Sequence, residues 1–340
     1  MIIAQPGSLT TDAERPEKGD TPMPDTSAAM PCFPPRTGRP DLDRFLQQLL
    51  SDRLVERIAA RSGEGKNAVR AKLAVYANEV PVGLRLIDGL VRPGMRVLEV
   101  GAGLCLLSLF LRAQGHEIVA LEPVGIGFDF FTAATDEILE NAKFCGLERL
   151  AIPAEALLRE SHGEFDLIFS VHVLEHMADL DVAFAGMARV LSPRGTMIHL
   201  FPNYTVPYEP HFGIPLVPFF PRASAALYRR RISAAEDLWR SLNFITLRRF
   251  ARLSRQHDLS VEFRRGVLYD FLQRFADNPI FAARHRNGIV GRLFGGLRAL
   301  GLLSSTRHLP PRLATPAVAI ARRRENACWP TRCAAASHQQ

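Results

Sequence analysis

A glycine turn between a buried strand and a helix constrains this sequence more than any other feature. Residues 95–100 are an apolar run typical of a buried strand, and an apolar helical pattern over 104–112 follows Gly101-Ala102-Gly103. The glycines let a ligand approach the backbone closely, and the first N–H groups of a helix have no partners within the helix. This order of elements predicts a nucleoside- or nucleotide-binding site at the end of the strand.

The next strand indicates which nucleoside ligand fits. It is predicted over 116–121 and ends on Glu122, where a carboxylate can accept both hydroxyls of an adenosine ribose. A dinucleotide fits poorly, because Leu106 stands where its fingerprint has a third glycine and because the charge of Glu99 would oppose phosphates. A ligand that joins adenosine to a positive centre fits better, and S-adenosylmethionine has both.

Strands and helices alternate along the chain. Further strands are predicted over 165–171, 196–201, 260–265 and 317–321, with helices over 179–190 and 242–257. Apolar residues at helical spacing also predict a helix over 42–58 capped by Asp41, and a helical run over 66–90 that breaks near Pro81. We therefore expect an α/β fold with a doubly wound, mostly parallel sheet that helices cover on both faces.

Composition shifts along the chain suggest its domain organisation. The core is expected over 92–265, preceded by a helical cap over 41–91. We expect disordered tails at 1–40 and 324–340, a proline-rich lid insertion at 202–240, a basic amphipathic insertion at 266–315 and a last strand at 316–323.

Charge is distributed unevenly. From residue 222 to the end there are 22 Arg, no Lys and 7 acids, a net of +15, so the first 221 residues carry 20 basic and 28 acidic residues, a net of −8. A basic half is compatible with nucleic acid, an anionic membrane or an anionic substrate. An overall preference for Arg, with 38 Arg against 4 Lys, explains part of it.

The cysteines and the N-terminus point to a cytoplasmic protein. The five cysteines are odd in number and form no Cys-x-x-Cys pair, which argues against a disulfide framework or a zinc ribbon. The N-terminal apolar run is too short for a signal peptide and lacks a basic segment. No uncharged apolar stretch reaches the ~18 residues of a spanning helix.

Three segments together carry a family resemblance. Val97-Leu-Glu-Val-Gly-Ala-Gly103 with Glu122, Phe165-Asp-Leu-Ile-Phe-Ser-Val-His-Val-Leu-Glu-His176 and Leu191-Ser-Pro-Arg-Gly-Thr196 resemble the class I S-adenosylmethionine-dependent methyltransferases. Within that family, the chain is most similar to the branch with the ubiquinone-biosynthesis O-methyltransferases. The resemblance is close over 92–203 and looser over 242–265 and 316–322. Cys105 stands where the family usually has a third glycine.

The resemblance implies S-adenosylmethionine as the cofactor and assigns residues to it. Glu99, Gly101 and Gly103 would line its methionine and ribose, and Glu122 would accept the ribose hydroxyls. Ala154 or Glu155 would flank the adenine, and His172 would lie near the transferred methyl group. Ala102 and Pro123 complete the expected cofactor-binding set.

The candidate catalytic residues are His211, His172 and Tyr204. A sulfonium is already a good methyl donor, so a general base is needed only to take a proton from the acceptor. His211 is the first choice, because an unperturbed histidine titrates near working pH. A packing role for His211 stays open, and Tyr204 with Tyr208 could simply line a wall. The apolar run 212–221 is either a lid over an apolar acceptor or part of the core.

We predict no metal ligands, although one short motif has to be considered. His172-Val-Leu-Glu175-His176 matches the His-x-x-Glu-His zinc-peptidase string, but that string needs a helix and here its first residue closes a strand. Metal assistance by Glu175 and His176, as in some relatives, is one interpretation. The other is that the two residues brace the following helix, so a site without metal is expected.

The sequence therefore predicts a methyltransferase, O-directed, acting on a small-molecule, glycan or lipid-type acceptor. Two alternatives remain: a nucleic-acid methyltransferase that uses the Arg-rich half, and a non-catalytic cofactor-binding domain. Nucleic acid is disfavoured, because Ser170-Val-His172 replaces the Asn/Asp-Pro-Pro-Tyr signature of amino-methylating relatives and no RNA-binding module is present.

A membrane surface is a further expected partner. The segment 284–312 has Ile289, Leu293, Leu297 and Leu300 at helical spacing, with arginines on its other faces. Such a helix either lies peripherally on an anionic membrane, at its inner face, or packs on the core.

Overall fold

The structure is a computed structural model that describes residues 38–123, 129–278, 281–282 and 288–324. Nearly all of the two expected tails, and residues 284–287 of the expected amphipathic helix, lie outside the described residues.

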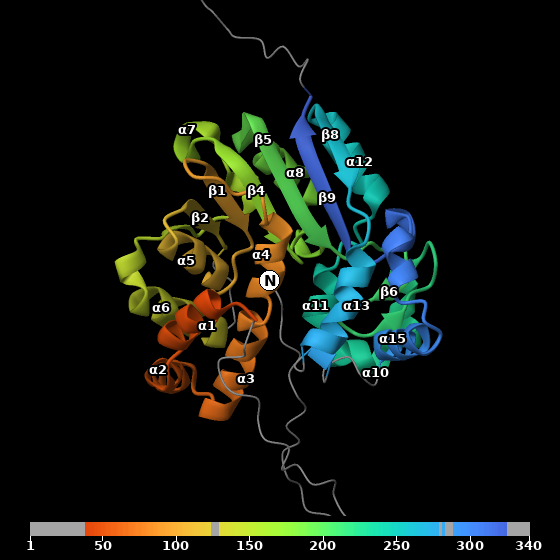
Figure 1. The fold of residues 1–340 in the computed structure, drawn as a ribbon, viewed down its shortest axis with the longest axis horizontal. Coiled ribbons are helices and arrows are strands. Elements are labelled where there is room, and N and C mark those ends of the chain that lie inside the picture. The colour runs from red at the N-terminus through yellow and green to blue at the C-terminus, as the bar shows by residue number, and fades with distance from the viewer. Residues whose placement is uncertain (1–37, 124–128, 279–280, 283–287, 325–340) are drawn as a thin grey trace, which may run out of the picture.

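The predicted α/β fold with a doubly wound, mostly parallel sheet is confirmed (Figure 1). Seven strands lie in the order β3-β2-β1-β4-β5-β9-β8, and β9 alone runs antiparallel to its neighbours. The strands are β1 (Arg96–Val100), β2 (Glu117–Leu121), β3 (Glu148–Leu150), β4 (Phe165–Val171), β5 (Leu191–Phe201), β8 (Leu259–Phe263) and β9 (Ala317–Arg323).

Helices precede this sheet in the chain, connect and cover its strands, and form most of the insertions. The N-terminal helices are α1 (Pro40–Leu49), α2 (Asp52–Ser62), α3 (Lys66–Ala77) and α4 (Val80–Ile87). The helices between strands are α5 (Leu106–Ala113), α6 (Asp129–Asn141), α7 (Arg159–His162), α8 (Leu180–Val190) and α12 (Leu247–Gln256). The insertions contain the hairpin β6 (Tyr208–Glu209) and β7 (Ile214–Pro215), then α9 (Ser224–Leu227), α10 (Arg229–Ile232), α11 (Glu236–Ser241), α13 (Val267–Asp277) and α15 (Ile289–Ala299).

Alternation along the strands builds one core on each face of the sheet. In β1, Val97 packs with the N-terminal helices, α5 and α6, whereas Leu98 faces the core formed with α8, α11 and α12. Both faces are apolar, as expected for parallel strands covered on both sides. The lid insertion contributes Phe212 and Ile214 to the second core, so this part of the run 212–221 packs inside the domain.

Three element boundaries differ from those that the sequence predicts. The N-cap of α1 is Arg39 rather than Asp41, because Pro40 occupies the first turn. α12 begins at Leu247, since Thr246 caps it by accepting a hydrogen bond from the amide of Arg249 at 3.2 Å. β5 begins at Leu191 rather than at the predicted residue 196, and its register with β4 shifts between Leu191 and Thr196.

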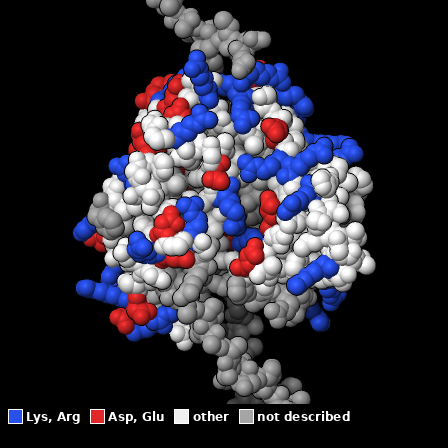
Figure 2. Space-filling view, in the orientation of Figure 1, with Lys and Arg blue, Asp and Glu red and all other residues white. Residues whose placement is uncertain are grey.

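The carboxyl ends of β1, β4 and β5 point toward the N-terminal helices on one side and the insertion helices on the other (Figure 1). The strand order reverses between β1 and β4, because β2 and β3 lie on one side of this pair and β5 on the other. Open α/β sheets bind ligands at such a switch point. On the face shown in Figure 2, the surface is hollowed between α4 and α13.

Two glycines provide a matched test of this packing. A Cβ atom on Gly186 in α8 would lie 2.0 Å from the backbone oxygen of Ala154, whereas a Cβ on Gly296 in α15 meets nothing within 4 Å. We expect Gly186→Ala to lose about 1–3 kcal/mol of unfolding free energy through overpacking. Gly296→Ala should gain about 0.5–1 kcal/mol through helix propensity. Urea unfolding measures both, and equal stability of the two variants would contradict the packing described.

Candidate cofactor and acceptor site

The glycine turn after β1 requires glycine at its first position. Gly101 has φ 73°, and a Cβ atom there would lie 2.3 Å from the Cγ2 atom of Val173. Gly103 also has a positive φ of 56°. Cys105, where the family usually has glycine, holds φ 59° at the start of α5, a conformation that costs a non-glycine residue about 1–2 kcal/mol.

Three successive amides fasten this turn to the end of β2. Gly101 and Ala102 donate to the carbonyl of Leu121 at 2.8 and 3.1 Å, and Gly103 donates to Oε2 of Glu122 at 2.8 Å. These N–H groups are therefore not available to cradle a phosphate, which agrees with the exclusion of a dinucleotide. Glu122 both ends β2 and holds the turn in place.

A cavity of about 60 Å³ opens beside the turn. Its wall includes Glu99, Gly101, Ala102, Gly103 and Val171. Glu99 is buried and accepts a hydrogen bond from Ser108 at 2.5 Å, and no basic side chain among the described residues pairs with it. Burial raises the pKa of Glu99 to about 8, Ser108 opposes the rise and the charge of Glu122 adds to it.

The N-terminal helices close this cavity with residues that the sequence did not single out. Tyr76 and Glu79 line it, and burial together with the charge of Glu122 raises the pKa of Tyr76. Glu79 accepts a hydrogen bond from Arg274 at 3.0 Å on Oε1, while its Oε2 atom is buried without a partner. Tyr76 lies in α3 and Glu79 in the turn before α4, within a run that the sequence predicts as helical, so no sequence signal marked either residue.

The remaining expected cofactor residues lie elsewhere. Pro123 is exposed and directly follows Glu122. Ala154 and Glu155 belong to a short 3₁₀ helix, Ala154–Ala156, that packs on α8, and neither lines the cavity described above. His172 directly follows β4 with φ 54° and lines a second cavity, bounded by α4, α13 and β9.

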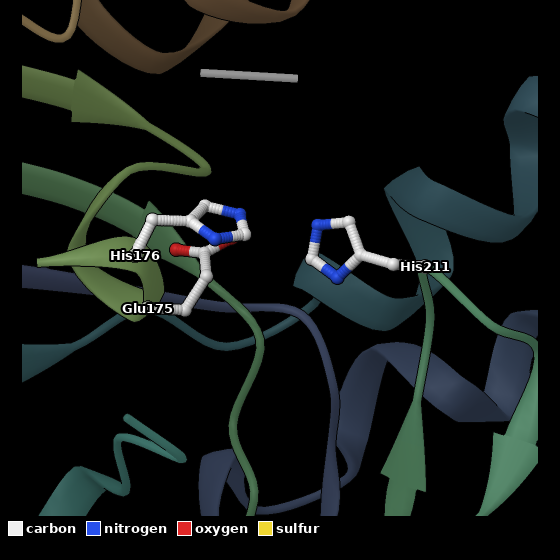
Figure 3. A group of neighbouring side chains, drawn as sticks. All are labelled: Glu175, His176 and His211. Carbon is white, nitrogen blue, oxygen red and sulfur yellow. The ribbon is translucent and has the colours of Figure 1, made fainter. Parts of the chain in front are cut away.

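The side chains of Glu175, His176 and His211 face one another (Figure 3), and His172 lies next to this group. One ligand atom from each lies within 4.8 Å of the other two. Glu175 and His176 come from the turn after β4, and His211 comes from the lid insertion, 35 positions along the chain. The sequence placed Glu175 and His176 together but could not show that His211 joins them.

The hydrogen bonds of His176 fix where its proton lies. Ser241 Oγ donates to the carbonyl of Leu238 at 2.8 Å, so it accepts from Nδ1 of His176 at 3.0 Å. The Nε2 atom of His176 then carries a lone pair, and no hydrogen-bond partner for this buried atom lies in the part of the chain that the structure describes. Burial lowers the pKa of His176 well below its usual value, which keeps the ring neutral.

Glu175, like Nε2 of His176, has buried polar atoms without hydrogen-bond partners among the described residues. Neither of its carboxylate oxygens has such a partner within the described ranges, and Nδ1 of His172 lies 3.8 Å from Oε1. Burial raises the pKa of Glu175 to about 7, and His211 opposes the rise. Lone pairs therefore converge on a point that suits a proton or a cation.

Glu209 orients His211. Nδ1 of His211 donates to Oε1 of this buried carboxylate at 2.6 Å, and the amide of Phe212 donates to its Oε2 at 2.6 Å. The hydroxyl of Tyr204 also donates to Oε1, at 3.2 Å, and burial raises the pKa of Tyr204 well above its usual value. Tyr204, which the sequence predicts as a candidate catalytic residue, thus donates to the carboxylate that orients His211.

The fold, with its glycine turn at the switch point, defines an α/β protein of the class that binds nucleosides at this edge of the sheet. Residues 42–263, well over half of the chain, match the family model described as a methyltransferase domain. The chain therefore belongs to this methyltransferase family. It is a methyltransferase that uses S-adenosylmethionine as methyl donor.

Relatives agree with the family. A Mycobacterium tuberculosis protein, itself uncharacterised, is 35% identical over 59% of this chain and 69% of its own length. A ubiquinone biosynthesis O-methyltransferase of Bartonella tribocorum is 28% identical over 38% of this chain and 48% of its own, and that of Caulobacter is 35% identical over 33% and 43%. The chain thus spans less than half of these two enzymes.

A solved geranyl diphosphate C-methyltransferase of Streptomyces coelicolor is 12% identical, covers 75% of this chain and 82% of its own, and has a TM-score of 0.47. A likeness this low says nothing about the acceptor. Within the described ranges, no helix is long and apolar enough to cross a membrane.

Glu99 predicts how pH affects cofactor affinity. Below its pKa of about 8 the carboxyl of the ligand-free protein holds a proton, and a cationic cofactor favours the ionised form. Affinity for S-adenosylmethionine should therefore rise as pH increases toward about 8, with proton release on binding. Calorimetry in buffers of different ionisation enthalpy measures that release. Glu99→Gln should remove it and Glu117→Gln should not; an unchanged Glu99→Gln profile would contradict the assignment.

Proposed function

We propose that this enzyme methylates a hydroxyl group of a small-molecule, glycan or lipid-type acceptor. The observation that supports it most is the group formed by Glu175, His176 and His211 beside His172, because a hydroxyl must lose its proton during methylation. The two relatives named as O-methyltransferases also support the choice of oxygen.

The residues beside the glycine turn fit the cofactor. S-adenosylmethionine supplies a methyl group on a sulfonium, which needs only an aligned nucleophile. The carboxylates of Glu99 and Glu79 would face its positive charge, and Gly101–Gly103 would give it a close backbone surface. Glu122 is buried behind Gly103 and does not itself line this cavity, so the proposed contact with the ribose hydroxyls rests on its place at the end of β2. The orphaned Oε2 of Glu79 and the lack of a basic partner at Glu99 are the features that a cationic ligand would satisfy.

His211 is proposed to take the proton of the acceptor hydroxyl. Glu209 behind Nδ1 fixes the ring and favours a positive charge on it, as an acidic partner does for a catalytic histidine. His172, next to β4, would orient the acceptor toward the methyl group. The buried position of Tyr204 suits it for holding Glu209 rather than for contact with the acceptor.

A divalent cation at the same group is a second proposal. Two imidazoles and a carboxylate are a ligand set that suits zinc and related metals, and Ser241 and Glu209 supply the outer hydrogen bonds that such histidines need. The orphaned atoms of Glu175 and His176 are the observation that favours it. A bound cation would lower the pKa of an acceptor hydroxyl.

One experiment separates these two roles. The full chain is purified, its zinc and manganese content is measured, and methyl transfer from labelled S-adenosylmethionine to an acceptor-containing cell extract is followed with and without a chelator. His211→Asn should lower transfer about tenfold or more under either role. The exposed His308→Asn is the matched control.

If a cation takes part, metal content should fall in His211→Asn, and chelated protein should lose activity that added zinc or manganese restores. Metal-free protein at full activity would refute the cation and leave His211 as the base. Full activity of His211→Asn would refute both roles.

A membrane contact is proposed for the surface of α15, in an enzyme that otherwise acts in the cytoplasm. Val290 is buried and Phe294 stacks on Phe275 at 4.9 Å, so this side of the helix packs on the domain. Three of the four residues of the predicted apolar stripe are exposed, with Ile289 at 41%, Leu293 at 45% and Leu300 at 72%, and Leu297 is half-buried. Exposed Leu beside exposed Arg suits an anionic lipid surface.

Vesicle sedimentation tests this contact. The full chain should pellet with phosphatidylserine vesicles at low salt and dissociate at high salt, because salt screens surface charges. Leu293→Asp with Leu300→Asp should weaken pelleting by about tenfold or more, and the exposed Leu313→Asp should not. A chain that stays in the supernatant at low salt would contradict the proposal.

A further inference from the structure

The second cavity lies at the carboxyl edge of the sheet, next to the cofactor cavity. It has a volume of about 100 Å³ and is bounded by α4, α13 and the ends of β5 and β9. Val171 lines the first cavity and His172 lines the second, so consecutive residues at the end of β4 separate the two. This cavity opens where Figure 2 shows basic side chains within the hollow between α4 and α13.

Positively charged side chains outnumber carboxylates in the lining of this cavity. Arg85, Arg264, Arg274 and Asp270 line it. Arg274 is paired, since it donates to Glu79 at 3.0 Å and lies over the ring of Phe281 at 4.4 Å. Arg85 and Arg264 form no hydrogen bond or ion pair through their side chains within the described part of the chain.

Neighbouring carboxylates only partly offset this charge. Asp270 is exposed at the cavity, and it acts on Arg85 together with Asp277 and Glu79, each raising the pKa of Arg85. Burial and the charge of Arg274 nevertheless lower that pKa, with burial the larger cause. Among the lining residues, Asp270 is the one carboxylate beside Arg85 and Arg264, so a bound anion would relieve the imbalance.

The remaining wall is apolar. Leu86, Leu200, Val267 and Val318 surround the space beside the arginines. An aliphatic or aromatic body would bury its surface there, while guanidinium groups bind carboxylate or phosphate oxygens in pairs. A neutral polar ligand would leave both arginines without partners.

We propose that this cavity binds an acceptor with an anionic group, a carboxylate or a phosphate, attached to an apolar body, through Arg85 and Arg264. The inference rests on the proposed methyltransferase function and names the class of its acceptor. Anchored there, the acceptor presents a hydroxyl at His172, whose Nδ1 lies 3.8 Å from Glu175. The anchor therefore lies within reach of both the cofactor cavity and the proton-accepting group.

Three probes of equal chain length test the anion requirement. Hexanoate, hexyl phosphate and the uncharged hexanamide are titrated into the full chain saturated with S-adenosylhomocysteine. At least one anion should bind about 10- to 100-fold more tightly than hexanamide, the range expected for hydrogen bonds to charged groups. The comparison of hexanoate with hexyl phosphate identifies the anion.

Adjacent arginines supply the matched variants. Arg264→Gln should remove this preference, whereas Arg265→Gln, at an exposed position outside the cavity lining, should keep it. Arg85→Gln gives an independent second reading if Arg264→Gln fails to fold. Equal affinity for all three probes, or equal behaviour of Arg264→Gln and Arg265→Gln, would overturn the proposal. Binding of S-adenosylhomocysteine is measured separately for each protein. If the unsubstituted chain did not bind it, the cofactor site, rather than the anion site, would be refuted.

Discussion

The buried carboxylate of Glu99 is the constraint on which the site depends. It lies near the end of β1 with a serine hydroxyl as its hydrogen-bond partner, and no basic side chain in the described part of the chain pairs with it. A buried charge of this kind is costly unless something cationic meets it or a proton neutralises it. In the proposed site, a positively charged cofactor would offset this cost.

The glycine turn, which is held by the end of β2, and the N-terminal helices together form the cavity that Glu99 lines. Glu122 ties down the turn through the amide of Gly103, so the same carboxylate that would meet a ribose also holds the backbone beside it. Glu79 then links the cofactor cavity to the second cavity, because its partner Arg274 lines the latter. The two cavities share α4 and the end of β4, so a cofactor and an acceptor bound as proposed would meet there.

Local sequence signals predicted the sheet and the cofactor turn well. The apolar run at 165–171 is β4 to the residue, and the strand ending at Glu122 is β2. Pro81 separates α3 from α4 as expected, because it occupies the first turn of α4. Each of these features depends on neighbouring residues, so each leaves a pattern in the sequence.

Contacts between distant segments left no such pattern. His211 meets His176 only because the lid insertion folds back over the turn after β4, and Arg274 meets Glu79 across 195 positions. Arg264 and Arg265 are indistinguishable in the sequence, yet only Arg264 lines the second cavity. The arginine excess of the C-terminal half thus contains a few residues at the site and others at the surface.

The most direct test of the account is calorimetric binding of S-adenosylhomocysteine to the full chain and to Glu122→Ala. The parent should bind with one site, and the variant should lose about tenfold or more in affinity, because it loses both a charged hydrogen-bond acceptor and the support of Gly103. Glu117→Ala, at the exposed start of the same strand, should bind like the parent. A parent chain that does not bind, or a Glu122→Ala variant that binds equally well, would contradict the cofactor site described.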